Sequence, residues 1–329
     1  MRTAVELSEQ ARGTTSPNPP VGCVVLDAAG EVAGQGATQP PGGPHAEIVA
    51  LRAAGDRANG GTAVVTLEPC STTGRTPPCT EALREAGVAR VVHAVPDPTL
   101  SGSGAAALRA SGVDVHSGLM ADEVATGPLR AWTHFARTGR PHVTWKYAAT
   151  LDGRTAAADG TSRWISSETS RTEVHRLRRQ VDAIVVGTGT ALADDPHLTA
   201  RDESGRLLER QPLRVVLGSR RLPAGARVLD DAAGTVQLDT DPASALDELA
   251  ARGVVDVLLE GGAGLAGGFV AADRVDRVLA YLAPALLGAG PAALGEAGVG
   301  SISQAWWLDV EKVSMSGSDV RVSAARRAR

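Results

Sequence analysis

The chain has 329 residues, of which 43% are hydrophobic but only 3% aromatic, and its formal net charge is −4 at pH 7. This length predicts two domains with cores built mainly from small aliphatic side chains, and the acidic balance argues against a nucleic-acid surface, which would be basic. Three cysteines, the lack of an apolar leader and the lack of a long apolar run predict a cytoplasmic protein without disulfides or a membrane span.

The first 140 residues alternate short apolar runs with helical patterns. The strands expected here cover residues 21–26, a hairpin partner ending near 38, and 62–67, 88–95 and 113–116. The expected helices cover 2–13, 45–54, a segment that begins at 77–78, 105–111 and 121–138. This alternation predicts an α/β sandwich in which helices cover the sheet.

One group of residues in this half carries metal chemistry: His45 and Glu47, then Cys70 and Cys79. One imidazole and two thiolates can hold zinc and leave a fourth position open for water. A glutamate two residues after the histidine is placed to shuttle protons beside the metal, as in zinc deaminases. The alternative is a closed structural zinc site, which a fourth ligand would favour. Cys23 is the only other cysteine, and its apolar setting places it in the core.

The run from Thr138 to Pro141 breaks the last helix of this half, so we expect domains at 1–140 and 141–329. The second half predicts strands at 143–148, 183–186, 214–217 and 254–259, a helix at 169–180 and a turn at 187–190. A glycine-rich loop at 260–268 opens a further helix. Such a loop exposes backbone N–H groups to a phosphate, although a flexible cap explains it equally well.

Two stretches resemble one known family. The cysteines enclose Ser-Thr-Thr-Gly-Arg-Thr-Pro-Pro, and the second half opens with Leu151-Asp152-Gly153-Arg154 and then Ser162-Arg163-Trp164. Both are similar to the bifunctional deaminase-reductase of riboflavin biosynthesis, in the same order and over essentially the whole chain. The resemblance implies a cytidine-deaminase-like α/β/α sandwich followed by an α/β domain similar to dihydrofolate reductase.

The resemblance also implies roles for individual residues. Asn18, which alone reads as a turn residue, is expected to face the substrate of the first domain. The cofactor is expected at Ala148, Trp164, Thr190 and Asp194, with its pyrophosphate on Gly262, Ala263, Gly264, Leu265, Ala266, Gly267 and Gly268. The substrate ribose and its phosphate are expected at Ser162, Arg178, Leu198, Arg201 and Glu260, where two arginines suit a phosphate dianion. Ser219, with Arg220 and Arg221, either holds a 2′-phosphate or forms an exposed basic turn.

The implied activity is the zinc-dependent deamination of 2,5-diamino-6-ribosylamino-4(3H)-pyrimidinone 5′-phosphate, followed by NADPH-dependent reduction of the ribosyl group. We expect a homo-oligomer with this small-molecule substrate as its partner. One alternative is a deaminase acting on nucleic acid, which the charge and the second domain oppose. The other is a chain active only as a reductase, because Thr72 stands where many family members have a histidine.

Overall fold

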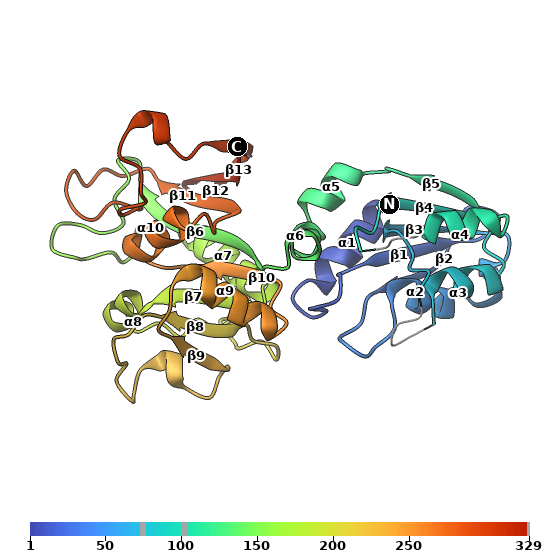
Figure 1. The fold of residues 1–329 in the computed structure, drawn as a ribbon, viewed down its shortest axis with the longest axis horizontal. Helices are drawn as coiled ribbons and strands as arrows, with labels where there is room; N and C mark the ends of the chain where they lie inside the picture. Colours follow the sequence, from blue (N-terminus) through green and yellow to red (C-terminus); the bar gives the residue numbers. More distant parts are fainter. Residues whose placement is uncertain (73–76, 100–103, 328–329) are drawn as a thin grey trace. The chain divides into compact units, whose positions relative to one another are not determined.

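The computed structural model describes residues 1–72, 77–99 and 104–327. It divides the chain into two compact units, Met1–Arg140 and Pro141–Arg329, each built on its own sheet (Figure 1). Helix α6 (Arg130–Thr138) ends where Gly139 takes a left-handed conformation, and Pro141 follows at the junction. Within the described chain, no helix is long and apolar enough to cross a membrane.

The sheet of the first unit has the strand order β2-β1-β3-β4-β5. Its strands are β1 (Gly22–Leu26), β2 (Val32–Ala37), β3 (Thr62–Leu67), β4 (Arg90–Val95) and β5 (Asp114–Ser117). Strand β1 runs antiparallel to both β2 and β3, whereas β3, β4 and β5 are parallel to one another. The carboxyl ends of β3 and β4 therefore meet at one edge of the sheet.

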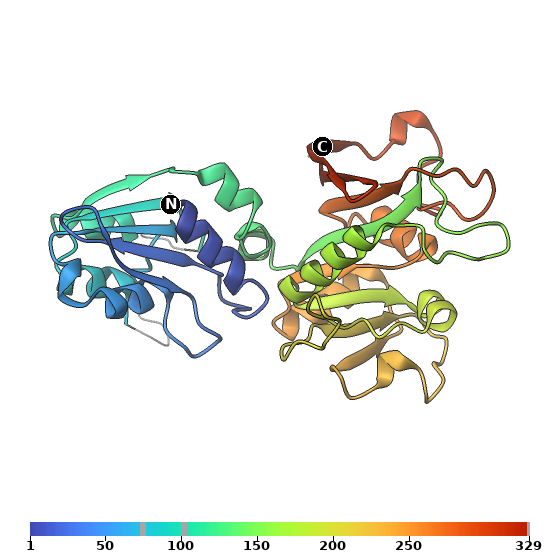
Figure 2. The same cartoon turned by 180° about the vertical axis from the view of Figure 1, so that it is seen from behind.

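Glycines show how the helices cover this sheet. A Cβ on Gly22 would lie 2.0 Å from the backbone oxygen of Ala4 in α1 (Arg2–Ala11). A Cβ on Gly36 would lie 2.6 Å from the backbone oxygen of Ala46 in α2 (Ala46–Ala54). Gly36 pairs with Cys23, the neighbour of Gly22, and neighbouring strand residues point to opposite faces. Helices α1 and α2 thus cover opposite faces, and the predicted sandwich is confirmed (Figure 2).

The remaining helices of this unit include one correction. They are η1 (Gly55–Ala58), α3 (Cys79–Glu85), α4 (Gly104–Ala110), α5 (Ala121–Thr126) and α6. The single helix predicted over 121–138 is wrong, because the chain breaks between α5 and α6. Gly127 leaves the helical region at φ −106° and ψ −117°, and the following Pro128 has no N–H to continue the hydrogen-bond pattern.

The second unit is built on an eight-stranded sheet with the order β12-β13-β11-β6-β10-β7-β8-β9. Its strands are β6 (His142–Thr150), β7 (Ala183–Gly187), β8 (Leu213–Leu217), β9 (Thr235–Leu238), β10 (Asp256–Leu259), β11 (Arg277–Ala283), β12 (Leu308–Ser316) and β13 (Asp319–Arg326). In the sheet, β11, β6, β10, β7, β8 and β9 lie side by side and are parallel to one another. Strand β13 pairs antiparallel with β11, and β12 pairs antiparallel with β13 at the edge.

Helices cover both faces of this sheet (Figures 1 and 2). They are α7 (Glu168–Gln180), α8 (Thr188–Asp194), α9 (Pro242–Ala251) and α10 (Ala263–Ala271), with short 3-10 turns η2 (Arg227–Leu229) and η3 (Ile302–Gln304). Val185 of β7 packs with α9 and α10, whereas its neighbours Ile184 and Val186 pack with α8 on the other face. The turn predicted over 187–190 is wrong, because α8 begins at Thr188, where buried Thr188 and Ala191 stabilise a helix by packing.

Candidate functional site

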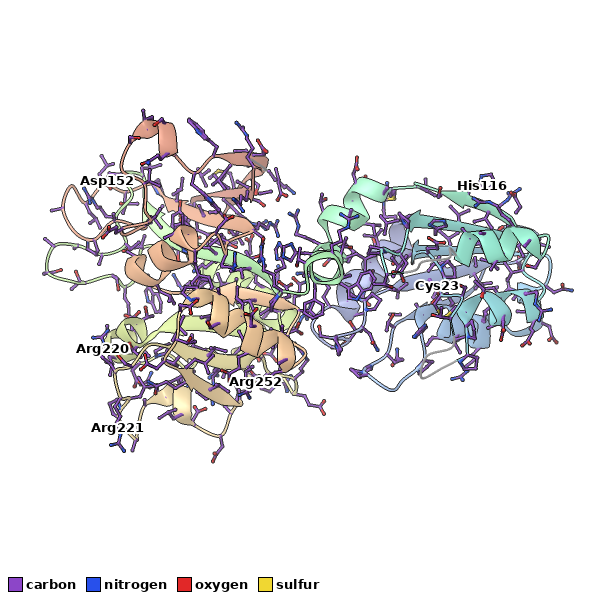
Figure 3. The ribbon with its side chains drawn as sticks, in the orientation of Figure 1. Cys23, His116, Asp152, Arg220, Arg221 and Arg252 are labelled. Atoms are coloured by element: carbon purple, nitrogen blue, oxygen red, sulfur yellow. The ribbon has the colours of Figure 1, made fainter. Side chains whose placement is uncertain are left out.

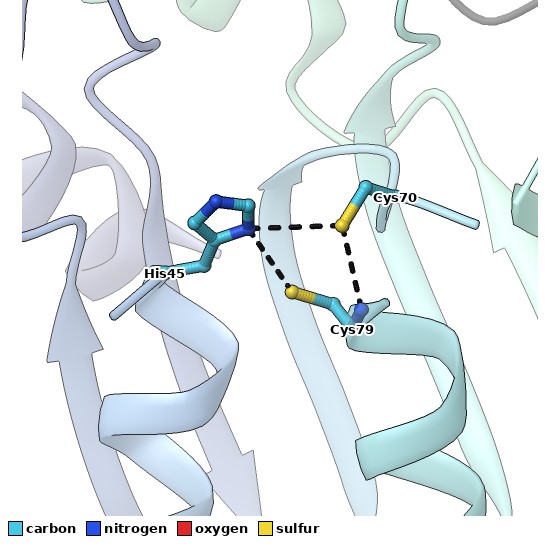
Figure 4. A group of neighbouring side chains, drawn as sticks. All are labelled: His45, Cys70 and Cys79. Carbon is cyan, nitrogen blue, oxygen red and sulfur yellow. Dashed lines mark hydrogen bonds between the residues drawn. The ribbon is translucent and has the colours of Figure 1, made fainter. Parts of the chain in front are cut away.

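Three metal-ligating side chains converge at the ends of separate elements in the first unit (Figure 4). His45 is the residue that precedes α2, Cys79 is the first residue of α3, and Cys70 follows β3. His45 Nδ1 lies 3.3 Å from Cys79 Sγ and 3.7 Å from Cys70 Sγ. The three ligand atoms all lie within 4.8 Å of one another, so this group could hold one metal ion.

The donor set fits zinc. One imidazole nitrogen and two sulfurs are the ligands of a catalytic zinc site with its fourth position open. Cys23 lies in the core on β1 and is not part of this group of neighbouring ligand atoms. No other group of three such side chains occurs among the residues that the structure describes. The described chain therefore offers an open site rather than a closed structural one.

Hydrogen bonds around the sulfurs favour a thiolate. The backbone N–H of Cys79 donates to Cys70 Sγ at 3.3 Å. Hydrogen bonds from the Cys79 thiol and from His45 lower the pKa of Cys70 to about 4, although burial opposes the shift. The same contact with Cys70 raises the pKa of His45. The group thus carries a ready anionic ligand at neutral pH.

Glu47 lies in the first turn of α2 and lines the same recess. Its side chain is buried, and burial raises the pKa of its carboxyl above the ordinary value. A carboxyl group with a raised pKa beside a metal-bound water suits proton transfer near neutral pH. The geometry therefore supports the general acid/base role predicted for Glu47.

The recess beside the ligand group has a volume of about 210 Å³. It is lined by Asn18, Pro19, Val21, Thr38, His45, Glu47, Leu67, Glu68, Cys70, Thr72, Asp97, Thr99 and Trp132. The predicted substrate residue Asn18 lies in it, together with Thr72. Sequence reasoning missed Trp132 and the segment after β4, although the carboxyl end of a parallel strand is a known place for functional side chains. Gly74, Arg75 and Thr76 of the cysteine insert lie outside the described residues.

The second unit contains a wider recess of about 700 Å³ bordered by α7 and the segment after α8. It brings together the predicted residues Ala148, Ser162, Trp164, Arg178, Asp194 and Glu260. Sequence reasoning missed Lys146, Arg171 and His197, which also line it. Lys146 had a signal, namely a charged residue in an otherwise apolar strand. Burial lowers the pKa of Lys146, an effect that nearby Glu260 opposes.

Arg178 and Glu260 form a bidentate ion pair, in which Arg178 Nε lies 2.7 Å from Glu260 Oε1 and Nη2 lies 2.9 Å from Oε2. Burial alone would raise the pKa of Glu260, but Arg178 holds it below the ordinary value. The carboxylate takes two of the five N–H donors of Arg178, so a contact between this side chain and a substrate phosphate stays a prediction that relies on the remaining donors.

Two other predicted substrate residues lie elsewhere. Arg201 lines a separate recess of about 440 Å³, together with Arg176 and Arg179 of α7. Its guanidinium donates to Thr199 Oγ1 at 3.2 Å and to the Gly205 carbonyl at 2.8 Å. The structure therefore does not bring Arg178 and Arg201 to one recess, although His175 borders both.

Leu198 is also outside the wide recess. Its side chain is buried in the core under α8, and its backbone has a left-handed φ of 51°. A side chain in this position cannot reach a ligand in the recess, so any contact that Leu198 makes would come from its backbone.

The glycine-rich loop and α8 border a further recess of about 510 Å³. The N–H of Gly262 donates to Thr190 Oγ1 at 3.1 Å, which joins the two segments. The predicted residues Thr190, Gly262, Ala263, Gly264 and Leu265 line this recess, and Asp194 borders both it and the wider one. A cofactor that spans the two recesses would therefore pass Asp194.

The rest of the predicted cofactor segment points elsewhere. Ala266 and Gly267 are buried in α10, Gly268 is outside the recess, and a Cβ on Gly267 would lie 2.1 Å from the Glu296 carbonyl oxygen. Arg220 lines the recess. A Cβ added at Gly189 would lie 2.8 Å from Arg220 Nη2. Ser219 and Arg221 are exposed and do not line it. Figure 3 labels Arg220 and Arg221.

Comparisons with known proteins agree with this geometry. Residues 1–95 match the family model of the cytidine and deoxycytidylate deaminase zinc-binding region, and residues 141–322 match that of the RibD C-terminal domain. The fold and the sites therefore define a zinc deaminase domain followed by a reductase domain, and the predicted fold class is confirmed.

Similar proteins cover nearly the whole chain. The riboflavin biosynthesis protein RibD of Mycobacterium tuberculosis (strain ATCC 25618 / H37Rv) is 53% identical and covers 99% of this chain and 96% of its own length. The structure of Acinetobacter baumannii RibD in its form 2 is 35% identical, with a TM-score of 0.87 over 99% of this chain and 97% of that one. A deaminase/reductase structure from Thermotoga maritima is 33% identical, with a TM-score of 0.90 over the same shares. The chain belongs to the RibD family of riboflavin biosynthesis proteins.

Proposed function

We propose that the chain catalyses two consecutive steps of riboflavin biosynthesis on one pyrimidine ribosyl phosphate. The first is deamination of 2,5-diamino-6-ribosylamino-4(3H)-pyrimidinone 5′-phosphate, and the second is NADPH-dependent reduction of its ribosyl group to ribityl. The observation that carries this proposal is the His45–Cys70–Cys79 group beside buried Glu47, in a chain whose other unit is a RibD reductase domain. The predicted cofactors, zinc and NADPH, are those of this enzyme family.

In the first unit, His45, Cys70 and Cys79 would hold the zinc ion, which when bound lowers the pKa of a water molecule and makes it a nucleophile. Glu47 would take the two protons of the attacking water one after the other and pass the first to the ring nitrogen and the second to the departing ammonia. Burial supports this role, because it raises the pKa of the Glu47 carboxyl above its ordinary value. Asn18, which lines the same recess, would orient the pyrimidine.

In the second unit, bound NADPH supplies the hydride that reduces C1′ of the opened sugar. Thr190 and the loop from Gly262 to Leu265 line the recess that would hold the pyrophosphate, and backbone N–H groups after Gly262, whose own N–H donates to Thr190, would bind it. Asp194 and Trp164 border the nicotinamide end, and Ser162 contacts the ribosyl group. Arg178 holds Glu260 in the recess, and a substrate phosphate that reached past His175, which borders both recesses, would meet Arg201.

The intact set of ligands argues against a chain with reductase activity alone. Replacement of the family histidine by Thr72 leaves the metal ligands and Glu47 in place. Thr72 lines the recess, where its hydroxyl still donates and accepts one hydrogen bond. We therefore expect weaker substrate binding rather than loss of the chemical step.

One assay tests both activities. Purified protein with known zinc content is given the diamino substrate, and ammonia, the ultraviolet spectrum and the product mass are followed with and without NADPH. We expect ammonia release without NADPH and the ribityl product only with it. Zinc-loaded protein that reduces the deaminated compound but releases no ammonia would establish the reductase-only alternative instead.

We also propose that the enzyme works in the cytoplasm as a homo-oligomer and does not bind nucleic acid. Exposed Val310, Val313 and Met315 on the edge strand β12 support self-association, because they place apolar side chains beside unpaired strand hydrogen-bonding groups. Light scattering on the purified protein would test this, and a molar mass of one chain at micromolar concentration would exclude it.

A further inference from the structure

Glu68 is a buried carboxylate that links three segments of the first unit. It follows β3 directly, two residues before Cys70, and its own N–H donates to the Val95 carbonyl at 2.9 Å. Its Oε1 accepts the N–H of Ala105 at 2.8 Å, and its Oε2 accepts the N–H of Asp97 at 3.3 Å. One side chain therefore ties the start of α4 and the segment after β4 to the metal-binding segment.

Close packing at Gly104 supports the same attachment. A Cβ at Gly104 would lie 1.8 Å from the Pro69 carbonyl oxygen and 3.3 Å from Thr80 Cγ2. Pro69 precedes one metal-binding cysteine and Thr80 follows the other. The start of α4 is thus seated directly on both cysteine-bearing segments, and only glycine allows the backbone to approach so closely.

The segment that Glu68 holds through Asp97 forms part of the recess wall. Asp97 and Thr99 both line the recess. Asp97 Oδ1 accepts from the Thr99 N–H at 2.8 Å and from Thr99 Oγ1 at 2.6 Å, which braces the segment internally. Both of these bonds go to Oδ1, and Oδ2 accepts none from the residues that the structure describes.

We propose that Glu68 is a positioning residue for the deamination step: it fixes Asp97 and Thr99 on the recess wall, where they accept hydrogen bonds from an amino or hydroxyl group of the substrate. A carboxylate suits such donors, whereas it would repel the phosphate end. This inference rests on the proposed deaminase function. Glu68 acts through backbone amides, so it affects substrate binding and leaves the metal site intact.

Two substitutions separate the reach of the side chain from its charge. Glu68→Gln keeps the length but turns an N–H donor toward one of the two amides, and Glu68→Asp keeps the charge but is too short to span both. Since a buried N–H without an acceptor is strongly unfavourable, we expect each variant to raise KM for the diamino substrate roughly tenfold, with a smaller change in kcat. Hydrogen exchange of the Asp97 and Ala105 amides should be faster in both variants.

Three controls define the effect. Glu81→Gln makes the same chemical change at an exposed position of α3 and should leave KM and exchange unchanged. Zinc content and reductase activity should remain at wild-type levels in every variant, which shows that the protein is folded.

Several results would overturn the inference. Wild-type KM in both variants would show that the amide contacts do not position the substrate, and recovery by Glu68→Asp alone would show that charge matters instead. Loss of zinc from either variant would place Glu68 in the metal site. Wild-type protein that releases no ammonia would contradict the proposed function rather than this inference, which the exchange measurement would still test.

Discussion

Glu47, which is buried, and Glu260, which is mostly buried, are carboxylates in candidate active sites, yet their pKa values shift in opposite directions. Burial raises the pKa of Glu47, whereas Arg178 overrides burial and lowers that of Glu260. Glu47 has a metal site as its neighbour, and Glu260 has a guanidinium that donates two hydrogen bonds to it. The partner therefore decides whether burial yields a proton carrier or a fixed anion.

The two sites also differ in how the chain assembles them. The group in the first unit comes from the starts of two helices and the segment after one strand. The wide recess of the second unit takes Lys146 from β6, Arg178 from α7 and Glu260 from the segment after β10. The predictions below test this contrast.

The largest effect should come from Cys79→Ser. Loss of a ligand should remove zinc and lower deamination by more than about a hundredfold, since even the loss of outer-shell partners has effects of that size. Reduction should persist, because the second unit has its own core. Metal analysis and the two activity assays check this. Retention of a full zinc equivalent would show that Cys79 is not a ligand.

Glu47→Gln should separate proton transfer from metal binding. The variant should keep its zinc and lose roughly 10²- to 10⁴-fold in deamination rate, the usual contribution of a general acid/base. Single-turnover ammonia release on metal-analysed protein gives the measurement. If zinc is lost together with activity, Glu47 is a ligand and the assigned role is wrong.

Glu260→Gln should lower the stability of the second unit, whereas Glu47→Gln should lower only the rate of deamination, because Glu260→Gln breaks an ion pair that is mostly shielded from solvent. We expect the second unit to lose about 3–5 kcal/mol in its free energy of unfolding, and reduction to fall while ammonia release persists. Glu248→Gln is the matched control, since its pair with Arg252 is exposed on α9 and should contribute about 0.5 kcal/mol or less. Denaturant unfolding of both variants decides the comparison.

The same pair predicts a pH dependence. The pKa of Glu260 is lower in the folded than in the unfolded chain, so its stabilising effect is complete above the unfolded value and is lost as pH falls through the folded one. The difference in unfolding free energy between wild type and Glu260→Gln should therefore shrink below about pH 4.5. A difference that grows on acidification would contradict the assigned shift.

Arg220→Gln and Arg221→Gln test the cofactor end of the second unit. Arg220 lines the recess beside Gly189 and Arg221 does not, so only the first substitution should raise KM for NADPH, by about tenfold for one charge-assisted contact. KM for NADH should not change in either variant. Equal affinity of the wild-type enzyme for NADH and NADPH would remove the 2′-phosphate from this site.

The smallest expected effect concerns Thr72→His. A longer side chain in the recess should lower KM for the diamino substrate by about two- to fivefold, the size of one added hydrogen bond, with kcat nearly unchanged. Substrate titration of both proteins gives the answer. If KM does not change, another residue such as Asn18 already supplies the contact.

Much of the first site was predictable because its signals are local. The site consists of a histidine before a helix, a glutamate two residues later, a cysteine after a strand and a cysteine at a helix start. Short sequence spacing and the geometry of helix ends are enough to predict where these residues lie. Each of these residues occupies the element predicted for it. Helix breaks were less predictable: the 121–138 pattern hid the break at Gly127 and Pro128.

The sequence by itself determined the metal-ligand group, the glutamate beside it and the α/β class of both units, because these depend on residue type, spacing and hydrophobic period. Only the tertiary structure decided that Glu260 takes two of the donors of Arg178, that Arg201 lines a different recess, and that Glu68 braces the recess wall. Each of these contacts joins residues far apart in the chain. Whether such side chains meet depends on strand order and packing, which no local pattern encodes.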